Sequence, residues 1–147
     1  MVPGQARRLA AARVAAGRDV GELAALLGIS YEAYYDLESF DEEIVDTLDF
    51  DELCRLGAAL ALDLRSFFGA ESVGEATFAE LAAGLERLMA EEGMPLDALE
   101  DRVGWELRTQ LAAPETFGGL PAVALADIGE PLGVDWRSFL PTGRNAG

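Results

Sequence analysis

The sequence contains no lysine, no histidine and only one cysteine, Cys54. Histidine is the side chain most often used for proton transfer near neutral pH and the commonest metal ligand in proteins. A single cysteine can form neither an internal disulfide nor a zinc site built from several thiolates. We therefore expect a protein that is not an enzyme and that holds no metal ion or other cofactor.

Positive charge is also scarce, because 27 acidic residues stand against 11 basic ones, all of them arginine, and the formal net charge is −16. Hydrophobic residues make up 50% of the chain, which is enough for a folded core despite that charge. The first twenty residues show no apolar run of the signal-peptide kind, and no segment approaches the length that spans a bilayer. We expect a soluble cytoplasmic protein without a membrane partner.

Signals that start and stop helices are dense in the first half of the chain. Asp19 and Glu22 are spaced as a capping box, and Gly28 can adopt the left-handed conformation that ends a helix. Between them, apolar residues recur every three or four positions, as on one face of a helix. Further start signals stand at Ser30, at Asp49 with Glu52, and at Asp63. The sequence therefore predicts an all-α protein built from short helices.

Three segments of the first half combine these helices with a characteristic turn. Residues 17–30, GRDVGELAALLGIS, contain a capped helix with a Leu-Ala pair and a Leu-Gly-Ile-Ser turn. Residues 31–38, YEAYYDLE, end in a Leu-Glu pair, and residues 53–68, LCRLGAALALDLRSFF, join a Leu-x-x-Leu pattern to a closing aromatic pair. In this order they resemble the Cro/C1-type helix-turn-helix family, also called XRE-like or lambda-repressor-like. The resemblance implies small helical bundles that commonly dimerise and read DNA with their second and third helices.

The second half of the chain repeats the pattern of the first. A shift of 76 residues equates apolar and glycine positions, including Leu85 with Leu9, Gly93 with Gly17, and Gly104 with Gly28. A shift of 72 residues equates LGVDWRSFL, residues 132–140, with LALDLRSFF, residues 60–68. Chance similarity between two amphipathic stretches is the alternative. The repeat predicts two diverged tandem domains, at 5–70 and 77–141, followed by a tail at 142–147, and the two domains are expected to pack as a pseudo-dimer.

The positions that contact DNA in this family are apolar or acidic here. Where the family usually has a phosphate-contacting glutamine, the chain has Val20 and, in the second copy, Leu96. Residues 19–54 contain twelve acidic residues and no basic one, whereas DNA affinity depends largely on neutralising phosphates. Pro114 should also cut short the third helix of the second copy. The chain is therefore expected not to bind DNA. The arginines near its start are expected on the solvated side of the first helix: Arg7, Arg8, Arg13 and Arg18.

Residues 40–52, FDEEIVDTLDFDE, are interpreted as an acidic loop. They do not follow the calcium-loop pattern, because they lack its central glycine and its closing glutamate. Either the loop is simply solvated, or it forms a docking surface together with the outward side of the preceding helix. On the docking interpretation, Tyr34 and Leu37 belong to the core. The expected partner-binding residues are then Tyr31, Glu32, Tyr35, Asp36, Asp41, Glu42 and Glu43.

Two functions remain open. In the first, the scaffold is an acidic protein-binding module that captures a basic protein, such as a toxin or a nucleic-acid-acting enzyme, in the manner of an immunity protein, antitoxin or anti-regulator. The alternative is a DNA-binding transcriptional regulator of the Cro/C1 family. The sequence leaves open whether the fused pair forms a further homo-oligomer.

Overall fold

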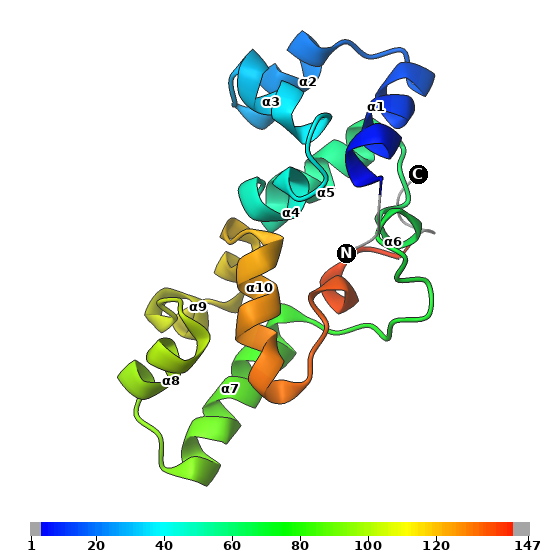
Figure 1. The fold of residues 1–147 in the computed structure, drawn as a ribbon. Helices are drawn as coiled ribbons and strands as arrows, with labels where there is room; N and C mark the ends of the chain where they lie inside the picture. The colour runs from blue at the N-terminus through cyan, green and yellow to red at the C-terminus, as the bar shows by residue number, and fades with distance from the viewer. Residues whose placement is uncertain (1–3, 143–147) are drawn as a thin grey trace.

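The computed structural model describes residues 4–142, so residues 143–147 of the predicted tail lie outside the described part (Figure 1). In this part the chain forms α-helices and short 3₁₀ segments (η), with one isolated β-bridge and no strand. The first half holds α1 (Gln5–Ala15), α2 (Val20–Leu27), α3 (Tyr31–Leu37), α4 (Glu43–Thr47), α5 (Phe50–Ala59) and α6 (Leu64–Phe67). The second half holds α7 (Phe78–Glu92), α8 (Leu96–Val103), α9 (Arg108–Ala112), η1 (Pro114–Gly119), α10 (Ala122–Gly129), η2 (Glu130–Leu132) and η3 (Trp136–Phe139). The all-α prediction is confirmed.

The predicted helix starts are formed by the expected side chains. At α2 the Asp19 carboxylate accepts from the Glu22 backbone N–H at 2.8 Å, and the Glu22 carboxylate accepts from the Asp19 N–H at 3.1 Å. Asp49 and Glu52 form the same reciprocal box at the start of α5. Single side-chain caps start the other two helices, Ser30 at α3 and Asp63 at α6. Each cap satisfies backbone donors that have no partner inside the helix. Local sequence therefore fixes where these helices begin.

Two glycine turns of the first half recur in the second. Gly17 and Gly28 have φ of +69° and +68°, and their equivalents after the 76-residue shift, Gly93 and Gly104, have φ of +60° and +83°. Any other residue would be strained in this left-handed conformation. The repeated glycines thus carry the same backbone turn before and after the second helix of each half.

The expected acidic loop at residues 40–52 is wrong in part, because most of it is helical. It contains α4 and the start of α5. Ile44 and Leu48 are each only 1% exposed, and Phe50 is 6% exposed. Ile44 and Leu48 are four residues apart, which is one helical turn, so they point to the same side and anchor the acidic segment to the core. The high acidic content concealed this apolar stripe.

One hydrophobic core runs through both halves of the molecule. A cluster of phenylalanine rings around the partly buried Phe78 of α7 packs against this core and joins the two halves. The centroid of that ring lies 5.2 Å from Phe50 of the first half, and 5.8 Å and 4.9 Å from Phe117 and Phe139 of the second. In Figure 1, α10 accordingly lies between α4 and α5 on one side and α7 on the other. The two halves therefore share one continuous core.

Several contacts between the halves are matched by the 72-residue shift, so that exchanging the equivalent positions of the two halves gives the same set of contacts. Asp49 and Pro121, the N-caps of α5 and α10, pair with each other in the isolated antiparallel bridge. Arg65 donates from Nε to the carbonyl of Leu140 at 3.1 Å. Its equivalent, Arg137, donates to the carbonyl of Phe68 at 2.8 Å. By the same shift, α10 is the equivalent of α5, and η1 is the equivalent of α4. Accordingly, α5 packs on η1, and α10 packs on α4. Each half thus gives the other a matching set of contacts.

Candidate functional site

The outward side of α3 carries two tyrosines and two carboxylates next to one another. Tyr31 and Tyr35 are 57% and 59% exposed, and Glu32 and Asp36 are exposed beside them. The four side chains line a shallow surface depression. We call this set the acidic tyrosine face. The prediction that these four residues point outward is confirmed.

The inward side of α3 holds this face in place. Tyr34 and Leu37 are fully buried, as predicted for core residues, and burial raises the pKa of the Tyr34 phenol above its ordinary value. At the end of the helix, the Glu38 carboxylate accepts two hydrogen bonds from the Arg13 guanidinium, at 2.7 and 3.0 Å. A two-point pair of this kind fixes orientation as well as distance. The exposed tyrosine rings are therefore carried by a helix whose other side is fixed in the core and by the Arg13–Glu38 pair.

A third exposed ring follows directly after the end of α3. Phe40 is 53% exposed, and its backbone N–H donates to the Asp36 carbonyl at 3.0 Å, so it follows directly after the last turn of α3. Glu42 is exposed close behind it in the chain. Phe40 was not among the predicted partner-binding residues. A large apolar side chain between two acidic stretches was the sequence signal for it.

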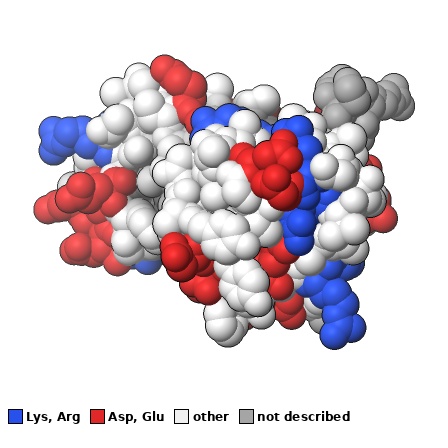
Figure 2. Space-filling model, turned by 90° about the horizontal axis from the view of Figure 1, so that it is seen from above, with Lys and Arg blue, Asp and Glu red and all other residues white. Residues whose placement is uncertain are grey.

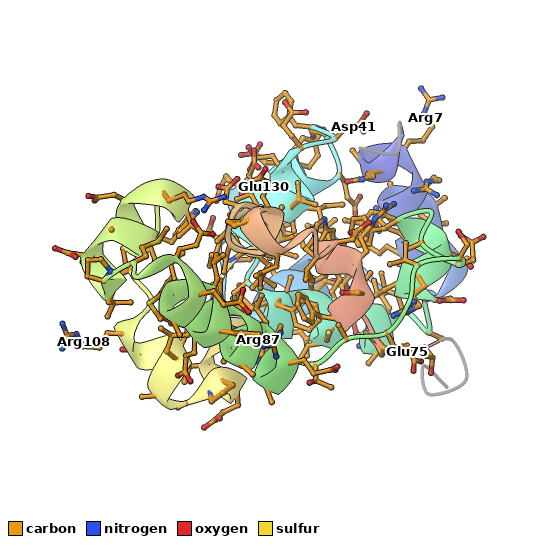
Figure 3. All side chains as sticks on the ribbon, turned by 90° about the horizontal axis from the view of Figure 1, so that it is seen from below. Arg7, Asp41, Glu75, Arg87, Arg108 and Glu130 are labelled. Carbon is orange, nitrogen blue, oxygen red and sulfur yellow. The ribbon has the colours of Figure 1, made fainter. Side chains whose placement is uncertain are left out.

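Asp41 and Glu43 have roles inside the molecule that the sequence analysis did not predict. The Asp41 carboxylate accepts from the backbone N–H groups of Gly4 and Ala6, at 3.2 and 3.0 Å, and so caps the start of α1. Figure 3 shows Asp41 between the turn after α3 and the blue α1. Glu43 accepts from the Thr47 hydroxyl at 2.9 Å. The structure therefore brings Tyr31, Glu32, Tyr35 and Asp36 together in one depression, and it turns Asp41 toward α1.

The expectation that the first arginines lie on a solvated side is wrong for Arg8 and Arg13, while the Arg18 side chain remains 35% exposed. Arg8 lies over the Phe67 ring, 4.6 Å from its centroid, and donates to the Phe67 carbonyl. Arg13 is held by Glu38, and the Arg18 Nε lies 3.7 Å from a Glu22 carboxylate oxygen. These guanidinium groups find partners because their long side chains fold back on the surface. Arg7 alone of the four is exposed, and it extends away from the molecule in Figure 3.

The second half presents a different surface at the equivalent place. As predicted, its third helix is short, because α9 ends at Ala112 and the chain continues as η1 from Pro114. Arg108 is exposed and points away from the body in Figure 3. The positions that the family uses for a phosphate contact, Val20 and Leu96, are half-buried and pack against the core. On the face seen in Figure 2, separate acidic groups lie among a few basic ones and much uncharged surface.

Comparisons with known proteins add no relative, since a scan of family models and searches of curated proteins and of solved structures found no match. Within residues 4–142, no three side chains of the metal-ligating types are grouped so that they could hold an ion. None of the helices in that range has both the length and the apolar character needed to cross a bilayer. The fold and this surface thus define an all-helical protein with an exposed aromatic and acidic face.

Proposed function

We propose that the chain is a protein-binding module that captures a basic protein with its acidic tyrosine face, extended by Phe40 and Glu42. The observation that carries the proposal is the pairing of exposed tyrosine rings with carboxylates in a stretch, residues 19–54, that contains no basic residue. Tyrosine rings offer contact area at a small cost in conformational entropy. Carboxylates around them attract a basic partner over long range and raise its association rate.

The scaffold under this surface is proposed to be a pair of diverged helix-turn-helix units fused into a pseudo-dimer. The matched contacts at Asp49 with Pro121, and at Arg65 and Arg137, support this arrangement. In a two-fold interface, residue i of one unit meets residue j of the other and the reverse contact also forms. The recurring glycine turns before and after the second helix of each half support it as well.

The partner is proposed to be a basic toxin or a nucleic-acid-acting enzyme, which would make the chain an immunity protein, antitoxin or anti-regulator. Such enzymes carry a positive surface that binds phosphates, and an acidic face can occupy it. A role in DNA reading has less support in this surface. Arg8 and Arg13 are held within the first half, and residues 19–54 add only negative charge.

Site-specific photo-crosslinking in the source cells tests the surface. A benzophenone amino acid at Tyr35 should crosslink one basic protein, whereas the same group at Ala90, exposed on α7, should not. The purified partner should then associate more slowly with a face variant, Glu32→Ala, Asp36→Ala and Glu42→Ala combined. A matched control with the same change in net charge should keep most of the wild-type rate and affinity: Glu75→Ala, Glu86→Ala and Glu91→Ala, all exposed.

The rate difference should shrink as salt rises, because the steering force is screened over about 10 Å at 0.1 M salt. If both triple variants bind the partner equally well, the acidic tyrosine face is only solvated and the proposal is wrong.

A further inference from the structure

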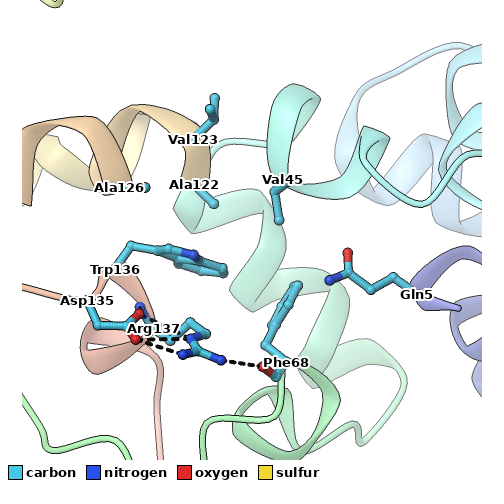
Figure 4. A pocket seen from close by; sticks show the side chains of 9 residues that line it. All are labelled: Gln5, Val45, Phe68, Ala122, Val123, Ala126, Asp135, Trp136 and Arg137. Carbon is cyan, nitrogen blue, oxygen red and sulfur yellow. Dashed lines mark hydrogen bonds and ion pairs between the residues drawn. The ribbon is translucent and has the colours of Figure 1, made fainter. Parts of the chain in front are cut away.

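A cavity of ≈ 450 Å³ lies where the two halves meet (Figure 4). Its walls come from α4 and Phe68 of the first half, from α10 and η3 of the second half, and from the start of α1. Small-molecule sites in proteins have volumes of about 300–1,000 Å³ and often lie between structural units. Size and position are therefore those of a binding site for a small molecule.

The lining of the cavity favours a flat, apolar ligand. Trp136 and Phe68 meet edge to face, with centroids 5.0 Å apart. Across from the Trp136 ring, Figure 4 shows the small side chains of Ala122 and Ala126 on α10, with Val45 of α4 beside them. A slot with an indole on one side and methyl groups on the other accepts a planar ring and buries both of its faces.

Gln5 supplies an unused hydrogen-bonding group at the edge of this slot. Its side chain lines the cavity although the residue is only 2% exposed, and no donor within residues 4–142 reaches its buried Oε1. Asp41 fixes the first turn of α1, including the adjacent Ala6, and so holds Gln5 in position. A buried carbonyl oxygen without a donor costs free energy. Rotation of the terminal amide of Gln5, whose last torsion is soft, would turn Oε1 into the slot, where a ligand carrying an N–H or O–H group could donate to it.

The charged residues of the cavity are already satisfied. Arg137 Nη2 lies 2.7 Å from Asp135 Oδ2, and the guanidinium also donates to the Phe68 carbonyl. This pairing holds the pKa of the Asp135 carboxyl below its usual value, so both groups stay ionised and neutralise each other. The cavity therefore has no spare charge with which to bind an ion.

We propose that this cavity binds a neutral, planar aromatic molecule whose N–H or O–H group donates to Gln5 Oε1. The site goes beyond the proposed partner surface, because no residue of the acidic tyrosine face lines it. Its residues come from both halves, so the bound ligand would bridge α4 and α10 and stabilise their packing.

Fluorescence with 7-amino-4-methylcoumarin as the probe tests the site, since this neutral dye absorbs where tryptophan emits. The background is Trp105→Phe, which leaves Trp136 as the reporter, because Trp105 donates to Asp127 outside the cavity. We expect saturable quenching of Trp136 emission and one bound probe per chain. Ala126→Phe should fill the slot and weaken binding at least about tenfold, whereas Ala90→Phe, exposed on α7, should leave binding unchanged.

Gln5→Leu tests the hydrogen bond separately. It should weaken binding of the aminocoumarin about tenfold yet leave 4-methylcoumarin, which lacks the amino group, nearly unaffected, with both affinities measured by isothermal titration calorimetry. Thermal melts check that each variant is folded, and Val123→Phe replaces Ala126→Phe if that variant is not. Quenching that does not saturate, or that persists in the filled variants, would overturn the site. An equal loss for both dyes in Gln5→Leu would overturn the assigned donor.

Discussion

Replacing Arg65 by methionine should destabilise the protein more than any equivalent change at a surface arginine. Arg65 is 7% exposed, and its guanidinium donates to the carbonyls of Leu140, Val73, Gly74 and Ser138 at 3.1, 2.6, 3.5 and 3.0 Å. Within residues 4–142 it has no carboxylate partner. Among the described residues, its hydrogen-bond acceptors are all backbone carbonyls.

The size of the effect follows from the two bonds that are buried, those to Leu140 and Ser138. Methionine fills much of the same volume but donates nothing, so two buried carbonyls lose their donor, and each costs about 1–3 kcal/mol. The other two carbonyls are partly buried, and water can replace the guanidinium there. We expect a loss of roughly 3 kcal/mol in the free energy of unfolding, a large part of the stability of a small protein.

Arg137→Met is the matched control because it removes the equivalent residue of the other half. The Arg137 side chain is 30% exposed and is paired with Asp135, so water can reach its former partners. Its loss should cost only about 1 kcal/mol. Urea unfolding followed by tryptophan fluorescence and by far-ultraviolet circular dichroism measures both values. If Arg65→Met lowers the free energy of unfolding by no more than Arg137→Met does, the buried hydrogen bonds of Arg65 do not have the proposed energetic role.

Three further results are expected. Asp41→Ala should lower stability by about 1 kcal/mol in thermal melts because it removes the cap of α1, whereas exposed Glu42→Ala should change it by less than about 0.5 kcal/mol; equal effects would contradict the capping role. Burial, assisted by the nearby charge of Asp51, raises the pKa of the Cys54 thiol to about 11. Its reaction with a disulfide reagent at pH 8 should therefore be about 100-fold slower than that of free cysteine, and it should accelerate as the pH rises toward 11. A rate like that of free cysteine at pH 8 would refute this. Random duplex DNA should show no binding by fluorescence anisotropy even at low salt, and tight, salt-sensitive binding would instead favour a DNA-reading regulator.

Local signals in the sequence were sufficient to predict most helix starts. A cap needs only a side chain and a backbone N–H two or three residues later, as at Asp19 and Ser30, so the pattern is readable without knowledge of the fold. Helical spacing likewise separated exposed Tyr31 and Tyr35 from buried Tyr34. Residues 40–52 were misinterpreted because a short helix with two apolar residues has too little periodicity to stand out among carboxylates.

Contacts between residues far apart in the sequence could not be predicted from local spacing. Asp41 caps a helix that begins 36 residues earlier, at Gln5, and no spacing rule connects the two. The repeat identified Arg65 and Arg137 as equivalent, yet both are arginines in a charged turn, and only the packing of the halves shows that they donate across the interface. The cavity beside Trp136 depends on that same packing.

The matched contacts between the halves are unequal in burial, and on the proposed fusion of two units this inequality affects how the two surfaces can differ. In an assembly of identical chains, one substitution alters both copies of a contact and its cost counts twice. In a fused pair of units each copy can change alone, and Arg65 is indeed buried while its counterpart Arg137 is partly exposed. On the proposed fusion, covalent joining would release each half from mirroring the other, so that α3 can carry tyrosines and carboxylates while α9 has only five residues.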